Sequence, residues 1–181
     1  MNYLINELLT FSKIEMKQMR ISVRKGDIMH FLEELSHIFD IVAGEREIDF
    51  IVNLEDTEEE VWFSPSKLER ILYNLLSNAF KYTQPGGYVK LSAKLIKEEK
   101  GTFVQISVKD NGRGIPKEAQ EQIFESYYQV EKRDHREGFG LGLSLTRSLI
   151  HMHKGEIRVE SEINKGSDFI VTLNVSEDAY N

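Results

Sequence analysis

The chain has 181 residues, of which 40% are hydrophobic, and its 23 Lys and Arg against 30 Asp and Glu give a net charge of −7. This size predicts one well-buried core with a short appendage, and the acidic balance argues against nucleic acid or an anionic membrane surface as a partner. The chain has no cysteine, which excludes disulfides and thiolate metal sites and suits a cytoplasmic setting. No apolar run approaches the roughly 20 residues of a membrane span.

The first two segments of the chain are both predicted to be helical. Residues 1–20 carry a wide apolar stripe that includes Leu4, Leu8 and Phe11, so this helix needs a partner, either in a bundle or dimer or on its own domain. Asp27 is predicted to cap a second helix over residues 28–42, where the globular domain begins.

The rest of the chain mixes strands and helices. Ser64 is predicted to cap a long helix that starts at Pro65 and ends near Tyr82. Further helices are expected over 117–124 and 141–153, where His151 and His153 would place a cation at the helix end. Residues 125–140 are polar and aperiodic, so they form either a lid or a disordered loop. Strands are predicted at 48–54, 61–63, 88–95, 102–109, 156–162 and 168–175.

These elements follow one another without a regular strand–helix–strand rhythm. The pattern favours an α+β fold, in which helices cover one face of a mixed, mostly antiparallel sheet as a two-layer sandwich, preceded by the first helix.

Two asparagines on the long helix are the first candidate site. Asn74 and Asn78 lie one turn apart, and Lys81 shares their face, opposite the apolar residues. Asparagine is a poor residue inside a helix, and its neutral amide oxygen is a suitable ligand for Mg²⁺. A solvated polar face is the alternative.

The end of the strand at 102–109 is the second candidate. Asp110 continues the alternation of Val104, Ile106 and Val108, so its carboxylate is predicted to point toward the core. Gly112 and Gly114 remove side chains beside it, which would let a flat ligand such as an adenine ring donate its amino group to the carboxylate. A hairpin turn at Asp-Asn-Gly is the alternative.

Three alternate glycines are the third candidate. Gly138, Gly140 and Gly142 lead directly into a helix, where backbone N–H groups can cradle phosphates. A flexible hinge explains the glycines equally well. Four basic side chains upstream either reach phosphate oxygens or are only solvated, namely Lys132, Arg133, His135 and Arg136.

Taken together, these segments resemble the ATP-binding domain of two-component sensor histidine kinases. This domain has the Bergerat ATP-binding fold, which type II topoisomerases and heat-shock chaperones share. Residues 74–83 resemble the N box of the family and residues 110–116 its first glycine box. Residues 123–129 resemble the F box, 138–143 the second glycine box and 166–169 the closing strand. Residues 4–14 resemble the second helix of the dimerisation hairpin.

The resemblance implies that ATP and Mg²⁺ are the cofactors. Asn78 and Asn74 would hold the metal, Lys81 would contact phosphate, and Asp110 would accept a hydrogen bond from adenine. The other implied nucleotide contacts are Tyr82, Gly112, Gly114, Ile115, Tyr128, Gly138, Gly140, Leu141, Gly142 and Leu143.

The resemblance also implies a domain division and a reaction. Residues 1–24 would be part of a dimerisation hairpin and residues 25–181 the ATP-binding catalytic domain. The family transfers the γ-phosphoryl group of ATP to a histidine on a dimerisation helix, and then to an aspartate of a receiver domain. The implied partners are therefore ATP, the phosphoacceptor helix of the same parent protein, a receiver domain and a second copy in the parent homodimer, and not nucleic acid.

Several positions refine this expectation. ATP-hydrolysing relatives carry a glutamate at position 74, whereas an amide cannot take up a proton, so Asn74 favours a kinase. None of the five histidines lies in an acceptor motif, so this chain is not expected to autophosphorylate and no residue is assigned a proton transfer. Ser64 and Ser126 replace an aspartate and a proline that are usual in the family. A serine-directed anti-sigma-factor-type kinase and a catalytically inactive nucleotide-binding dimer module remain as alternatives.

Overall fold

The computed structural model describes residues 20–128 and 140–180, and within this part the strands form two sheets. The larger sheet has the order β2-β4-β5-β7-β6. Its strands are β2 (Asp49–Leu54), β4 (Tyr88–Glu98), β5 (Gly101–Asp110), β6 (Glu156–Glu162) and β7 (Gly166–Asn174). β2 pairs with β4 in parallel, and all other neighbours in this sheet are antiparallel. The predicted mixed, mostly antiparallel sheet is confirmed.

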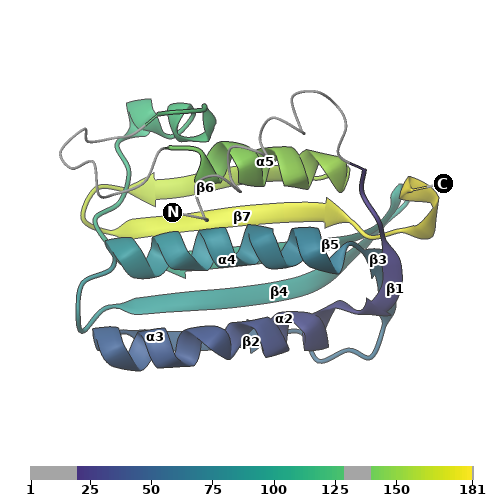
Figure 1. The fold of residues 1–181 in the computed structure, drawn as a ribbon, viewed down its shortest axis with the longest axis horizontal. Helices are drawn as coiled ribbons and strands as arrows, with labels where there is room; N and C mark the ends of the chain where they lie inside the picture. Colours follow the sequence, from purple (N-terminus) through teal and green to yellow (C-terminus); the bar gives the residue numbers. More distant parts are fainter. Residues whose placement is uncertain (1–19, 129–139, 181) are drawn as a thin grey trace.

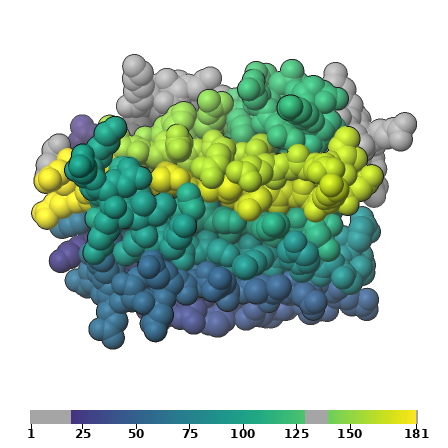
Figure 2. Space-filling model, turned by 180° about the vertical axis from the view of Figure 1, so that it is seen from behind, coloured from purple at the N-terminus to yellow at the C-terminus, as the bar shows by residue number. Residues whose placement is uncertain are grey.

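The helices lie on one face of this sheet. They are α2 (Ile28–Ser36), α3 (Ile38–Arg46), α4 (Pro65–Tyr82) and α5 (Gly142–Met152). In Figure 1, α4 crosses the middle of the sheet, α2 and α3 run beside β2, and α5 lies over β6 and β7. Seen from behind, teal β4 and β5 and yellow β7 form the surface, and no helix of the described residues covers them (Figure 2). The predicted two-layer α+β sandwich is confirmed. None of the helices described is long and apolar enough to cross a membrane.

The core fills the space between α4 and the sheet. Apolar residues recur every three or four positions along α4, and the inward positions of β4, β5 and β7 meet them. Each fully buried aliphatic side chain contributes about 1.5–3 kcal/mol relative to an exposed one, so this layer fixes α4 firmly. The buried residues of α4 are Leu68, Ile71, Leu72, Leu75, Leu76, Ala79 and Phe80.

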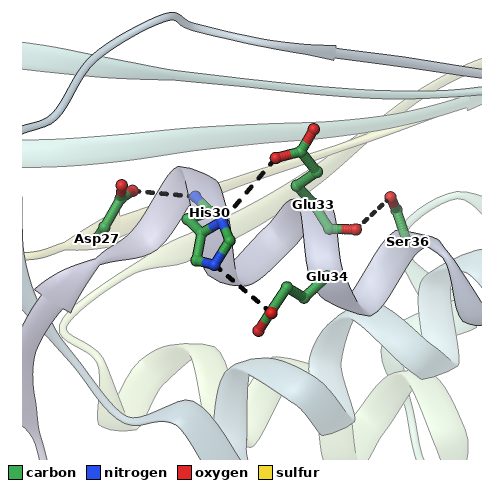
Figure 3. A network of polar contacts seen from close by, with 5 residues as sticks. All are labelled: Asp27, His30, Glu33, Glu34 and Ser36. Carbon is green, nitrogen blue, oxygen red and sulfur yellow. Dashed lines mark hydrogen bonds and ion pairs between the residues drawn. The ribbon is translucent and has the colours of Figure 1, made fainter.

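A second, two-stranded sheet lies at the start of the domain, and the backbone N–H of Trp62 in it donates to the Val175 carbonyl at 2.9 Å. β1 (Arg24–Asp27) pairs antiparallel with β3 (Glu60–Phe63), and the sequence did not predict β1. Asp27 then caps α2, as predicted, because its carboxylate accepts a hydrogen bond from the backbone N–H of His30 at 2.9 Å. Figure 3 shows this cap, with the His30 ring beside Glu33 and Glu34.

The predicted helix over residues 28–42 is interrupted. α2 ends at Ser36 and α3 begins at Ile38. The Ser36 hydroxyl donates to the backbone carbonyl of Glu33 at 2.6 Å (Figure 3), and such a side-chain bond competes with the helical ladder. The short helix expected over 117–124 is also wrong, because this stretch forms two 3₁₀ turns, η1 (Lys117–Ala119) and η2 (Gln122–Phe124).

The start of α4 is stabilised differently from the prediction. Pro65 begins the helix as expected, but the buried Ser64 hydroxyl makes no cap and has no hydrogen-bond partner in the described structure. Instead, the backbone N–H of Ser64 donates to Nε2 of His153 at 3.3 Å, and Nδ1 of His153 donates to the Leu149 carbonyl at 3.0 Å. Burial lowers the pKa of His153, so the expected cation at this helix end is wrong for His153.

Candidate nucleotide site

Three of the predicted segments meet at one end of the helical layer. They are the C-terminal half of α4, the loop that follows β5, and the first turn of α5. A Cβ atom on Gly142 would lie 2.6 Å from Oδ1 of Asn74, and one on Gly112 would overlap the backbone carbonyl of Tyr82. Only glycine allows both approaches, so these two residues bring the flanking segments against α4.

Asp110 ends β5 with its side chain directed inward. It is 5% exposed, and the three alternating residues before it are buried as predicted. Its Oδ1 accepts a hydrogen bond from the backbone N–H of Gly112 at 2.8 Å. Burial raises the pKa of the Asp110 carboxyl, and the hydrogen bonds from the backbone of Gly112 and Ser167 oppose this shift. A buried carboxylate without a cationic partner is costly, and a neutral donor on a bound ligand would offset that cost.

Tyr82, at the end of α4, has two cationic side chains within 5 Å of the centre of its ring. The guanidinium of Arg113 is 4.4 Å from the centre of the Tyr82 ring, and Nζ of Lys81 is 4.9 Å from it. Lys81 and Tyr82 are both half-buried. This arrangement places positive charge beside the carboxyl end of α4, where it would favour an anionic ligand.

The two asparagines of α4 are in different surroundings. Nδ2 of Asn74 donates to the hydroxyl of Thr146 on α5 at 2.6 Å. Asn78 is half-buried one turn further along α4. Asn74 therefore joins α4 to the first turns of α5, and Asn78 is the next residue of the same face.

The loop after Asp110 is docked on the turn between β6 and β7. The backbone N–H of Ile115 donates to the Ser161 hydroxyl at 2.8 Å, and the N–H of Asn164 donates to the Arg113 carbonyl at 2.8 Å. A Cβ atom on Gly114 would overlap the backbone of Glu162. Rigid attachment of this kind keeps the glycine loop close to the Asp110 carboxylate.

The second glycine box is described only in part. Gly138 and the four basic residues upstream lie outside the described residues. The backbone N–H of Tyr127 donates to the Gly140 carbonyl at 2.9 Å, which joins the two sides of the segment. Leu141 is buried and precedes α5, while Leu143, Ile115 and Tyr128 are partly buried against the core. The predicted residues of this box that are described thus lie at the start of α5.

The side chains near the glycine loops include possible ligands for a metal ion. The described residues contain no cluster of three His, Asp, Glu or Cys able to hold a metal ion. These residues therefore do not form a metal site from protein ligands alone. Mg²⁺ also accepts a ligand set of amide oxygens, water and phosphate oxygens. Asn74 and Asn78 fit that requirement, because they offer amides one turn apart.

A shallow depression of about 250 Å³ lies on the other face of the sheet. None of its lining residues belongs to the glycine loops, and its polar side chains on β4 and β5 occupy the outward positions of those strands. We assign no function to it. Its lining residues are Asn53, Leu54, Glu55, Ser92, Ala93, Lys94, Gln105 and Ser107.

Sequence reasoning missed several residues of the site. Thr146 contacts Asn74, and the available signal was its position one turn after Gly142 on the same helix. Ser161 was also missed, although its hydroxyl lies 2.9 Å from that of Ser167 and donates to the Gly166 carbonyl. No local pattern indicates a serine pair across a hairpin.

Comparison with known proteins relates this geometry to a family. Residues 63–177 match the family described as "Histidine kinase-, DNA gyrase B-, and HSP90-like ATPase". The chain is 34% identical, over 97% of its length, to the sensor histidine kinase WalK of Bacillus subtilis. Among solved structures, it resembles full-length ShkA in complex with AMPPNP, with a TM-score of 0.84 and 27% identity over 96% of the chain. The catalytic domain of histidine kinase ThkA gives a TM-score of 0.75 and 25% identity over 88% of the chain.

The coverage of these matches differs. The chain spans 28% of WalK and 35% of the ShkA chain, but 99% of the ThkA catalytic domain. It spans less than half the length of the curated relatives that it matches.

Proposed function

The chain belongs to the histidine kinase-, DNA gyrase B- and HSP90-like ATPase family, and from this premise we propose that it is the ATP- and Mg²⁺-binding catalytic domain of a sensor histidine kinase. Its parent would transfer the γ-phosphoryl group of ATP to a histidine on a dimerisation helix in two-component signalling. The names of its relatives, such as the sensor histidine kinase WalK, support this reading.

The observation that supports the proposal is that α4 contacts the loop after the buried Asp110 at Tyr82 and the start of α5 at Asn74. Asp110 is almost fully buried, the hydrogen bonds to its carboxyl come from the backbone of Gly112 and Ser167, and the charge that acts on it is the like charge of Asp168. An adenine amino group would supply the missing donor. The first turn of α5, held against Asn74 through Gly142, would face the phosphates with its N–H groups.

The remaining residues would complete the nucleotide site. Asn78 and Asn74 would hold Mg²⁺, which supplies charge neutralisation for the triphosphate when it is bound. Lys81 and Arg113 would add positive charge around Tyr82. Positioning and charge neutralisation carry most of a phosphoryl transfer, so such a site needs no general base of its own.

The side chain at position 74 favours a kinase over an ATPase. The amide of Asn74 donates to Thr146, and an amide cannot accept a proton from water near neutral pH. The acceptor histidine would therefore come from a dimerisation helix, and the phosphoryl group would pass to a receiver aspartate. Residues 1–24 would contribute the second helix of that hairpin, most of which lies outside the described residues. Residues 25–181 would form the catalytic domain of a cytoplasmic, dimeric portion of the parent.

Calorimetric titration of the chain with AMPPNP tests the binding site. Asp110→Asn should weaken binding about 10- to 100-fold with or without Mg²⁺, as expected for loss of a hydrogen bond to a charged group. Asn78→Ala should weaken binding only when Mg²⁺ is present. Asp49→Asn and Asn53→Ala, at exposed positions of β2, are the matched controls and should leave affinity unchanged. Wild-type affinities in both site variants would remove both assignments.

A second experiment tests the reaction. The chain would be mixed with a separate acceptor-helix peptide and ATP labelled at the γ-phosphate. Label on histidine supports the kinase, label on serine supports the anti-sigma-factor type, and AMPPNP binding without any transfer supports the inactive module.

A further inference from the structure

β2 forms one border of the larger sheet and pairs only with β4. The backbone N–H groups of Asp49 and Glu55 donate to carbonyls on the β4 side, so every second residue of β2 uses its backbone groups on that side. The residues between them direct their N–H and C=O groups to the outer side. These are Phe50, Val52 and Leu54, and no other backbone group of the described chain pairs with them.

The two borders of the sheet differ in protection. β6, at the other border, places Glu156, Arg158, Glu160 and Glu162 on one face, and all four side chains are exposed. Charged side chains of this kind discourage the addition of another strand. β2 has no charge between Phe50 and Leu54, and two apolar side chains are solvent-accessible there, Ile51 at 45% and Val52 at 38%. The outer edge of β2 is therefore open to strand addition.

Acidic side chains flank this open edge at both ends. Glu47 and Asp49 precede its centre, and Asp56 and Glu58 follow it, all of them exposed. None of the four makes an ion pair within the described residues. The lysines at positions 90 and 94 lie on β4, one strand further in. The outer side of β2 thus combines unpaired backbone groups, an apolar centre and negative charge at each end.

We propose that the outer edge of β2 binds an extended segment of a partner protein as an additional strand, and that this segment has apolar residues at its centre and basic residues at its ends. The backbone groups of Phe50, Val52 and Leu54 would pair with the backbone of the segment, which supplies affinity without a deep pocket. The flanking acids would select the charge of the segment.

A second copy of this chain would fit the edge less well. β2 has acids before and after its centre, so a partner β2 would set acid against acid whether it ran parallel or antiparallel. Like charges that face each other across strands are destabilising. The charge pattern therefore favours a basic partner over self-association.

The probe is a fluorescein-labelled synthetic peptide with two lysines at each end and alternating valine and threonine between them. Fluorescence anisotropy would measure its binding to the full 181-residue chain. Replacing the lysines by glutamates should abolish binding, because the flanking acids then repel the ends. N-methylation of every central residue should weaken binding about tenfold or more, because it removes the backbone donors while the charge stays the same.

Variants of the chain locate the site. Val52→Pro removes one outward N–H and spares the pairing with β4, so it should weaken binding about tenfold or more, whereas Val52→Thr keeps the N–H and should stay within about twofold of wild type. Reversing two acids, Asp49→Lys with Asp56→Lys, should weaken binding about three- to tenfold. The same reversal on the other border, Glu156→Lys with Glu160→Lys, is the matched control and should leave affinity unchanged. Circular dichroism melts verify the folding of each variant.

Four outcomes overturn the inference. These are no binding of the lysine peptide up to about 1 mM, equal binding of the N-methylated peptide, equal binding of the glutamate peptide, and wild-type affinity in a folded Val52→Pro variant. Self-association that is lost on Val52→Pro, measured by sedimentation velocity without peptide, would identify a second copy as the occupant and overturn the proposed partner. None of these measurements involves nucleotide, so the proposed function is tested separately.

Discussion

His153 should make the stability of the domain fall as the pH falls below neutrality. The ring is fully buried, and both of its nitrogens are occupied, by the Ser64 N–H and by the Leu149 carbonyl. Protonation would place a second donor against the Ser64 N–H, 3.3 Å away. The folded protein therefore resists the proton that the unfolded chain accepts.

The size of the effect follows from proton linkage. Burial first, and then the charge of Lys67, lower the pKa of His153 below its ordinary value of 6.5. Below pH 6.5 the unfolded chain binds a proton that the fold excludes, so stability decreases as the pH falls. The loss is about 1.4 kcal/mol between pH 7.5 and 5.5, provided that the folded ring stays neutral. Asp110, whose pKa is raised, contributes in the opposite direction, but it is common to every variant compared and cancels.

Urea unfolding at pH 7.5, 6.5 and 5.5 would measure this loss. His153→Gln keeps an acceptor for the Ser64 N–H but cannot titrate, so its stability should decrease less than that of wild type, by about 1.4 kcal/mol over this range. His151→Gln, at the exposed neighbouring histidine, is the control and should behave as wild type. If wild type and His153→Gln have the same pH dependence, His153 is not the buried neutral ring that the structure describes.

Four further substitutions test the packing by denaturant unfolding. Ser64→Ala should not lower stability, because the buried hydroxyl has no partner in the described structure, whereas a capping serine would cost about 0.5–2 kcal/mol. Gly112→Ala should cost about 1–3 kcal/mol through overlap with the Tyr82 carbonyl and should also weaken AMPPNP binding. Gly44→Ala should increase the free energy of unfolding by up to about 1 kcal/mol, because a Cβ atom at this position would have nothing within 4 Å. Phe80→Ala, which removes a ring 5.7 Å from that of Phe39, should cost about 3–5 kcal/mol, and a loss below 1 kcal/mol would contradict the core described.

The parts of the fold that could be predicted are those with a local periodic signal. α4 has apolar residues at helical spacing over five turns, and its start at Pro65 and end at Tyr82 are as predicted. The inward direction of Asp110 followed from counting alternate residues back through Val108. These patterns are strong because one face of each element is buried.

The parts that could not be predicted depend on partners distant in sequence. The apolar residues keep their helical spacing across residues 36–38, so the sequence pattern does not indicate the break between α2 and α3. The structure shows the hydrogen bond of the Ser36 hydroxyl at this point. The Ser64 N–H is satisfied by a ring 89 positions away, where sequence reasoning expected a side-chain cap. The parallel pairing of β2 with β4 likewise results from packing.

In the candidate site too, the features with a local sequence pattern could be predicted, and those that depend on a distant partner could not. Glycines and amides in recognisable order predicted three segments that the structure brings together. Thr146 was not predicted, because a threonine inside a helix is ordinary unless its neighbour across the layer is known.

The hydrogen bond from the Tyr127 N–H to the Gly140 carbonyl has a consequence for how this chain can vary. The bond holds the residues that follow η2 beside the residue that leads into α5. A substitution that displaces either of these two segments should therefore displace the other as well.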